Sequence, residues 1–278
     1  MDKNLVQRAL AGLVFLAIMI TCICFSVYSS VTLFLLLGML SAWEFTGLIN
    51  QKKQLGSGRF LILGLQAFLA VLAGVAFFTM LSGQLHVLIA ATAVFITTVI
   101  LFVLKNEIEM RLALVATNVF SIIYALFPFL ALAVLSFVSW TGGANFIVLY
   151  FFVLIWTNDT MAYCCGRLFG KTKLAETISP KKTVEGFVGG IIFTTLVSFL
   201  ILKVWDLPIG NPIVYYVAPA IVGVFGTAGD LLESALKRWV GVKDSGNIIP
   251  GHGGLLDRFD GAIFAIWPYI ITLTLLNR

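Results

Sequence analysis

A polar segment near the end of the chain carries carboxylate, hydroxyl and ammonium groups at helical spacing. Its first members recur at i, i+3, i+4 and i+7 and would share one face of a helix. They are Asp230, Glu233, Ser234 and Lys237. After a glycine-rich loop, Asp257 and Asp260 repeat the i, i+3 carboxylate spacing. Carboxylates that converge from two helices suit a hard cation such as Mg²⁺, which takes oxygen ligands and often bridges to substrate phosphates.

Basic residues and glycines surround these carboxylates. The basic residues are Lys237, Arg238, Lys243 and Arg258. Such side chains bind phosphate, and arginine offers a bidentate fork. Gly251, Gly253 and Gly254 flank His252 and allow the backbone to approach a ligand closely. His252 is either a structural loop residue or a catalytic one. A solvated loop explains any single residue, but the whole set favours a phosphate site.

A further acid, Asp159, interrupts an apolar run, where a charge costs about 2.5–3.5 kcal/mol on insertion scales. Small or polar residues follow it at helical spacing, at Tyr163, Gly166 and Gly170. An intramembrane acid is a functional candidate by default. The alternative is an interfacial carboxylate that pairs with Arg167 or Lys171.

Ser179-Pro180 predicts the start of another helix, since proline is tolerated in the first turn. Lys181, Lys182 and Thr183 would then lie at a helix N-terminus, where free N–H groups and the helix dipole favour a phosphate. The alternative is that these lysines extend to lipid headgroups. Both interpretations bring an anionic phosphate to this segment.

Long apolar runs must position these residues. Hydrophobic residues make up 60% of the 278 positions and charged residues 11%. The runs have the length of about 20 residues that a helix needs to cross a bilayer, and they lack the alternation of barrel strands. The sequence therefore predicts an all-α, polytopic transmembrane helical bundle of about nine helices. The expected spans are residues 10–28, 31–49, 60–81, 85–104, 113–137, 146–166, 187–204, 213–229 and 261–276.

The basic residues divide unequally between the two sides of this bundle. If the N-terminus is cytoplasmic, 16 of the 18 lysines and arginines lie inside, and only Lys203 and Arg278 lie outside. The net charge of +5 therefore indicates topology and anionic lipid rather than nucleic acid. The first apolar run is interpreted as an anchor helix. Residues 1–145 are predicted to form a lipid-facing scaffold, and residues 146–278 to carry the chemistry on cytoplasmic polar segments.

Two other patterns are weaker than they look. The cysteines, Cys22 with Cys24 and Cys164 with Cys165, match no zinc or disulfide framework and are expected to pack as apolar side chains. Gly170-Lys171-Thr172 ends like a P-loop, but the required first glycine would fall at Cys165 and no strand precedes it. The sequence therefore argues against a P-loop NTPase.

The segment from Ser234 to Asp260 resembles the signature of the phosphatidate cytidylyltransferase (CDP-diacylglycerol synthase) family. The matching positions are Ser234, Leu236, Lys237, Arg238, Lys243, Asp244, Gly246, Ile249, Pro250, His252, Gly253, Gly254, Leu255, Asp257, Arg258, Phe259 and Asp260. Upstream blocks of the family are similar to Asn158-Asp159, Ala162-Tyr163, Gly166-Arg167 and the run from Ser179 to Gly186. The N-terminal half matches only as hydrophobic spans.

The resemblance implies transfer of a cytidylyl group from CTP to phosphatidate, giving CDP-diacylglycerol and pyrophosphate. It also implies Mg²⁺ dependence, an active site on the cytoplasmic side of the inner membrane, and a homodimer. Catalytic contacts are then expected from Asp230, Asp257, Lys237, Arg258 and Asp260, with Asp230, Asp257 and Asp260 as metal ligands. Substrate contacts are expected from Lys181, Lys182, Ser234, Arg238, Lys243, Asp244, His252, Gly253, Gly254, Asp159 and Glu185.

Two other classes of protein fit the chain less well. Another transferase acting on a lipid phosphate, such as a polyprenol kinase or a prenyltransferase, is the first, but a prenyltransferase would carry aspartate-rich repeats in two separate loops. An ion-coupled transporter is the second, and it would place ionisable groups near the midplane and often show inverted repeats. Here the polar residues gather toward one surface.

Overall fold

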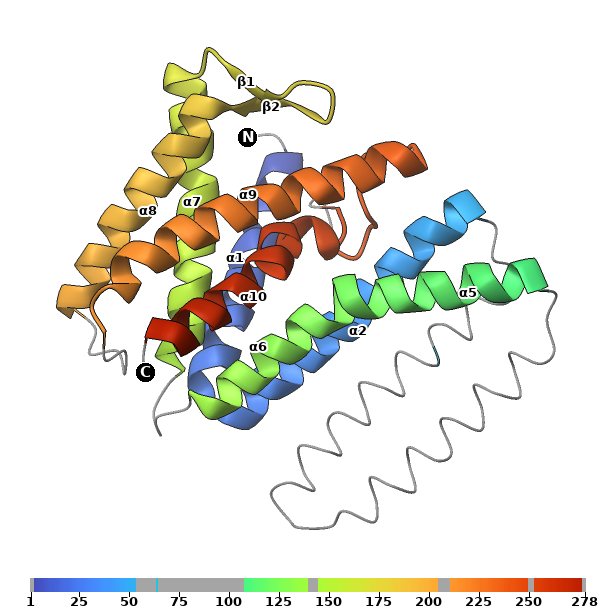
Figure 1. The fold of residues 1–278 in the computed structure, drawn as a ribbon, viewed down its shortest axis with the longest axis horizontal. Coiled ribbons are helices and arrows are strands. Elements are labelled where there is room, and N and C mark those ends of the chain that lie inside the picture. The colour runs from blue at the N-terminus through green and yellow to red at the C-terminus, as the bar shows by residue number, and fades with distance from the viewer. Residues whose placement is uncertain are drawn as a thin grey trace, which may run out of the picture. The chain divides into compact units, whose positions relative to one another are not determined.

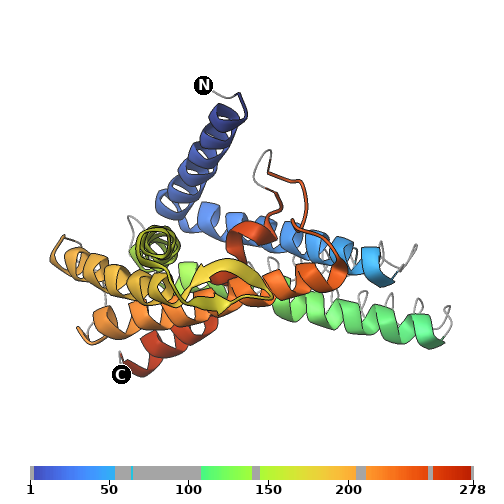
Figure 2. The same ribbon diagram turned by 90° about the horizontal axis from the view of Figure 1, so that it is seen from above.

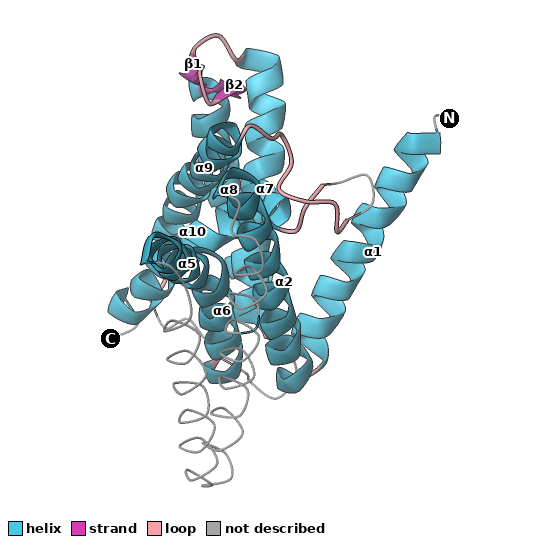
Figure 3. Cartoon of the chain, turned by 90° about the vertical axis from the view of Figure 1, so that its right-hand side faces the viewer, coloured by secondary structure: helices cyan, strands magenta, loops and turns pink. Residues whose placement is uncertain are grey.

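The computed structural model describes residues 3–53, 64, 108–139, 145–204, 211–249 and 253–276, and helices dominate these residues (Figure 3). In chain order the elements are α1 (Lys3–Phe25), α2 (Val27–Lys53), α5 (Ile108–Ser121), η1 (Ile122–Leu126), α6 (Phe127–Val138), α7 (Phe146–Phe169), β1 (Lys173–Ala175), β2 (Ser179–Thr183), α8 (Val184–Val204), α9 (Val214–Val240) and α10 (Leu256–Leu276). The predicted spans 60–81 and 85–104 lie, apart from residue 64, outside the described residues.

Six helical stretches of the described chain are long and apolar enough to cross a membrane. They are Val27–Lys52, Val115–Val138, Phe146–Phe169, Val184–Ile201, Val214–Val240 and Leu256–Leu276. Helix α1 adds a shorter apolar stretch, Leu10–Phe25. The prediction of a polytopic, mainly helical membrane protein is confirmed.

The chain divides into two compact units. One comprises Met1–Leu33 and Ala131–Arg278, and the other comprises Phe34–Leu130. In the second unit α2 packs against α5 and η1: the Phe45 and Tyr124 rings lie 5.4 Å apart, and the Ser121 hydroxyl contacts the Ala42 carbonyl at 3.4 Å. All the predicted site residues belong to the first unit.

Within the first unit, α7 packs chiefly on α8, and α9 packs on α10 and α8 (Figures 1 and 2). Buried tyrosines tie these four helices together. The Tyr150 ring lies 5.7 Å from Tyr215 and 6.4 Å from Tyr269. The Tyr150 hydroxyl pairs with the Ser198 hydroxyl at 2.7 Å, and Ser198 donates to the Tyr215 carbonyl. The Tyr269 hydroxyl donates to the Ile147 carbonyl at 3.1 Å, so the hydroxyls of Tyr150, Ser198 and Tyr269 all have partners inside an apolar core.

Helices α7 and α8 approach closely because small residues face each other at their crossing. A Cβ on Gly186 would lie 2.6 Å from the Ala162 carbonyl oxygen, and one on Gly189 would lie 2.6 Å from the Cys165 side chain. Small residues at such crossings allow tight packing of membrane helices. The glycine spacing noted on α7 therefore serves helix contact.

The expected helix start at Ser179-Pro180 is wrong. Ser179–Thr183 forms strand β2, which pairs antiparallel with β1, and Lys181 and Lys182 therefore lie on a strand (Figure 1). Helix α8 begins one residue after Thr183, whose hydroxyl accepts from the Gly186 N–H at 3.1 Å. This N-cap satisfies a free helix amide and sets the boundary later than proline alone predicts.

Helix α9 is longer than the predicted span 213–229, and its helical spacing continues to Val240. It ends at Gly241, whose φ of 92° lies in the left-handed region. The Gly241 and Val242 N–H groups both donate to the Lys237 carbonyl at 2.9 Å. Such a C-terminal glycine motif satisfies the last carbonyls of the helix, and it places the four-residue polar face in the final turns of α9, as predicted.

Candidate active site

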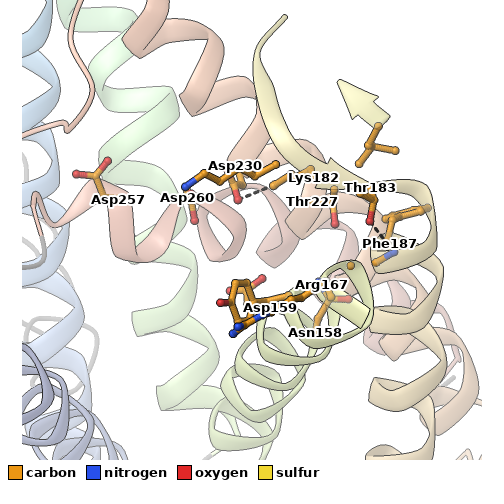
Figure 4. Close-up of a pocket in the computed structure, with 16 residues that line it drawn as sticks. Asn158, Asp159, Arg167, Lys182, Thr183, Phe187, Thr227, Asp230, Asp257 and Asp260 are labelled. Atoms are coloured by element: carbon orange, nitrogen blue, oxygen red, sulfur yellow. Dashed lines mark hydrogen bonds and ion pairs between the residues drawn. The ribbon is translucent and has the colours of Figure 1, made fainter. Parts of the chain in front are cut away.

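The first unit contains a pocket of about 390 Å³ between α7, the β1–β2 hairpin, α8, α9 and α10 (Figure 4). Several residues singled out from the sequence line it: Asp159, Lys181, Lys182, Asp230, Asp257 and Asp260. The structure thus brings together acids and lysines that are separated by up to about a hundred positions in the chain.

An ion pair joins the hairpin to α9 inside this pocket. The Lys182 ammonium lies 2.6 Å from Oδ2 of Asp230, and both side chains are partly exposed. Oδ1 of Asp230 accepts a hydrogen bond from Ser234 at 3.3 Å. The basic residue in direct contact with Asp230 is therefore Lys182 of strand β2, which lies 48 positions earlier in the chain.

Two further aspartates face the same pocket. Asp159 lies on α7, and Asp260 lies in the first turns of α10, where its Oδ1 accepts from the Gly261 N–H at 2.7 Å. Among the described residues Asp159 makes no ion pair with Arg167 or Lys171, so the interfacial pairing considered from sequence is absent there. Figure 4 shows Asp230, Asp260 and Lys182 close together, with Asp159 across from them.

Asp257 lines the pocket but lies apart from this group (Figure 4). Its Oδ1 is 2.5 Å from the Lys237 ammonium. Its Oδ2 accepts from the Ser245 N–H at 2.9 Å, the Ser245 hydroxyl at 3.0 Å and the Gly254 N–H at 2.8 Å. Both oxygens are therefore engaged by donors of the protein.

Lys237 does not line the pocket, although it contacts Asp257, which does. Its ammonium lies between Asp257 and Glu233, whose Oε1 is 3.1 Å away, and 12% of its side chain is exposed. Its position on the same helix face as Glu233 follows the predicted spacing, but the residues it contacts are carboxylates of the protein.

Glu185 anchors the hairpin. Its carboxylate accepts from the backbone N–H groups of Lys171 at 3.0 Å and Thr172 at 3.1 Å. Both acceptor oxygens are thus directed at the turn that leads into β1. Among the predicted substrate residues, Glu185 does not line the pocket.

The other predicted residues that the structure describes lie on the loop between α9 and α10 or beside it, outside the pocket lining. Lys243, Asp244 and Arg258 are exposed, and Arg238 contacts the Val242 carbonyl at 3.3 Å. Gly253 pairs with Ile249 in an isolated bridge. His252 lies outside the described residues.

Several residues that line the pocket were not among the predicted catalytic, substrate or metal residues. Asn158, Arg167 and Thr183 stand in the quoted family blocks, and Thr227 precedes Asp230 by three positions on α9. The i−3 spacing of Thr227 was a usable signal. Phe187 lines the pocket from α8 and had no signal beyond its hydrophobicity.

Comparison with known proteins identifies the family to which the chain belongs. The profile described as "Cytidylyltransferase family" matches residues 6–276. A protein of Staphylococcus haemolyticus named phosphatidate cytidylyltransferase is 48% identical over 126 residues, 45% of this chain and 48% of that protein. One of the same name from Bacillus subtilis is 49% identical over 127 residues, 45% of this chain and 46% of that protein. The matched region spans about half the length of these curated relatives. Since the profile extends over nearly all 278 residues, the chain belongs to the cytidylyltransferase family.

Proposed function

We propose that the protein is a phosphatidate cytidylyltransferase, which transfers the cytidylyl group of CTP to phosphatidate and releases pyrophosphate. One observation carries the proposal: aspartates from three helices, Asp159, Asp230 and Asp260, share a pocket with Lys181 and Lys182 of the hairpin. Membership of the cytidylyltransferase family and the names of its relatives support the choice of CTP and phosphatidate.

The basic residues of the pocket would hold the substrate phosphates. Lys181, Lys182 and Arg167 line it, and the Lys182 side chain stays partly exposed although its ammonium pairs with Asp230. Arginine can bind a phosphate in a bidentate manner, whereas lysine acts as a point charge. Together they would bring two strongly anionic substrates to one place.

In the proposed reaction, a phosphate oxygen of phosphatidate attacks the α-phosphorus of CTP. A new P–O–P bond forms, and the bond from the α-phosphorus to the bridging oxygen of pyrophosphate breaks. A phosphate monoester is already nucleophilic at neutral pH, so the protein needs no strong general base. Its residues would act by positioning the two substrates and neutralising their charge.

The pocket chemistry fits Mg²⁺. Carboxylate oxygens are suitable ligands, although no group of three His, Cys, Asp or Glu side chains in the described parts of the chain is arranged to hold a metal alone. Mg²⁺ is usually held by one or two carboxylates together with substrate phosphates. Asp230 and Asp260 would supply those carboxylates. Asp257 is less suited because four donors of the protein engage its two oxygens, against two donors at Asp230. When bound, the ion would neutralise phosphate charge.

We also propose the finer arrangement in the membrane. The lengths of the apolar runs support about nine helices. The distribution of basic residues supports a cytoplasmic N-terminus and a site on the cytoplasmic side of the inner membrane. The family resemblance supports a homodimer, which cross-linking in native membranes would test.

The proposal is tested with the purified chain, CTP labelled at the α-phosphate, and phosphatidate in mixed micelles. Labelled lipid should form only when phosphatidate and Mg²⁺ are both present, with release of one pyrophosphate per lipid. Two results would refute the proposal. One is transfer of the γ-phosphate of a nucleotide to a polyprenol, and the other is no labelling of lipid by the α-phosphate of CTP at any Mg²⁺ concentration.

A further inference from the structure

Glu233 is a buried acid for which the proposed reaction has no use. It lies on α9 with none of its surface exposed, and it is absent from the pocket lining. No residue that the structure describes donates a hydrogen bond of good geometry to either of its carboxylate oxygens, and the Lys237 ammonium lies 3.1 Å from its Oε1. A buried carboxylate is costly unless it is paired, so its partner determines whether this part of the fold is stable.

Lys237 is shared between two carboxylates. Its ammonium lies 3.1 Å from Glu233 and 2.5 Å from Asp257, and its side chain is largely buried. An ammonium has three donors, and two are directed at carboxylates of the protein. With its head group enclosed and outside the pocket lining, Lys237 is poorly placed to bind a substrate phosphate.

Asp257 also binds the loop between α9 and α10. Its Oδ2 holds the Ser245 N–H, the Ser245 hydroxyl and the Gly254 N–H, and Ser245 is buried. Gly253 allows this approach, since its φ is 85° and a Cβ there would lie 2.8 Å from Oδ2. The loop is therefore tied at both ends to one side chain, which Lys237 holds in turn.

We infer that Lys237 is a positioning residue: together with buried Glu233 it fixes Asp257 and, through Asp257, the loop beside the pocket. The expected changes in kcat and KM rest on the proposed function, whereas the expected changes in melting and hydrogen exchange rest on the geometry alone. Glu233 and Asp257 compete for the one ammonium, so removing that ammonium leaves two carboxylates uncompensated. Removing one partner of a buried ion pair is strongly destabilising, whereas replacing the ionic groups together is often neutral.

This predicts an unusual order of effects. Lys237→Met should lower kcat at least about tenfold and lower the thermal midpoint, because both carboxylates are left facing each other. Adding Glu233→Gln to it removes one of those charges, and Asp257 keeps its three loop donors. The double variant should therefore recover at least about threefold in kcat and melt higher than Lys237→Met alone. Its KM for CTP should stay close to that of the wild type.

The experiment compares wild type, Lys237→Met, Glu233→Gln and the double variant in detergent. Lys52→Met and Glu176→Gln, which change exposed residues far from this cluster in the sequence, are the matched controls and should match wild type. Hydrogen exchange of residues 241–256 gives a readout independent of turnover. The Ser245 and Gly254 amides should exchange faster in Lys237→Met and be protected again in the double variant. Recovery of protein from membranes only for the double variant would count as the same rescue.

The opposite pattern overturns the inference. The double variant would then have the same kcat and melting temperature as Lys237→Met. Both variants would show the same rise in KM for CTP, without faster amide exchange in the loop. That result would mean that Lys237 binds the nucleotide directly. Failure of the proposed function is distinguished from this outcome because wild type would then turn over neither substrate, while the exchange and melting order would still hold.

Discussion

Gly186 lies where α7 and α8 touch, and replacing it by alanine should separate the two helices. The new Cβ would lie 2.6 Å from the Ala162 carbonyl oxygen, 3.0 Å from the Gly166 Cα and 3.0 Å from the Thr183 hydroxyl. Two of these neighbours are backbone atoms that cannot rotate away. The helices must therefore move apart by roughly half an ångström or more to restore ordinary contact.

The expected loss of stability is modest and the loss of activity is larger. Overpacking costs about 1–3 kcal/mol, and alanine recovers about 1 kcal/mol of helix propensity relative to glycine. The net cost is then about 0–2 kcal/mol. The same shift moves Asp159 on α7 relative to Lys182 on β2, the strand that leads directly into α8, and a displacement near 1 Å can reduce turnover about 100-fold. We expect kcat to fall about 10- to 100-fold.

Gly226→Ala is the matched control. It lies on α9 in the same unit, but its Cβ would meet nothing closer than Ile155 at 3.6 Å. It should keep wild-type turnover and melt at the same or a higher temperature. The assay is initial-rate CDP-diacylglycerol formation beside thermal unfolding in detergent. Wild-type kcat for Gly186→Ala, or equal losses for both variants, would refute the argument that this crossing sets the geometry of the pocket.

Three other perturbations probe the same region. Lys182→Met and Asp230→Asn should each remove most turnover, and the double variant should lose little more, because the pair acts as one unit; fully additive losses in initial rate would contradict this. Glu185→Gln should weaken the contact that anchors the hairpin, and it should therefore raise the KM for CTP. Hydrogen-exchange measurements should show faster exchange of the turn amides near Thr172, and unchanged exchange would exclude an anchoring role for Glu185. Asn247→Cys, in a background without the native cysteines, should react with an impermeant maleimide only after cells are permeabilised, and labelling in intact cells would reverse the proposed topology.

Much of the fold follows from local sequence. The helices begin and end near the limits of the apolar runs, because a chain in hydrocarbon must satisfy its backbone internally and does so as helices. The i, i+3, i+4, i+7 pattern also predicted correctly that helix α9 continues past the predicted span 213–229. The hairpin was missed because a serine-proline start signal is local, whereas the boundary depends on the Thr183 cap and on pairing with β1.

The sequence by itself determined which residue types the site would use, since acids and lysines stand out in a chain that is 60% hydrophobic. It could not determine their partners. Glu233 and Lys237 share a helix face with Asp230, yet Asp230 meets Lys182 from the hairpin, while Lys237 is enclosed with Asp257. Spacing along one helix determines which side chains share a face, but the oppositely charged side chains that pair with them come from distant segments of the chain. Only the tertiary structure brings those segments together, and it thereby separates the aspartates that line the pocket near Lys182 from Asp257, which holds a loop.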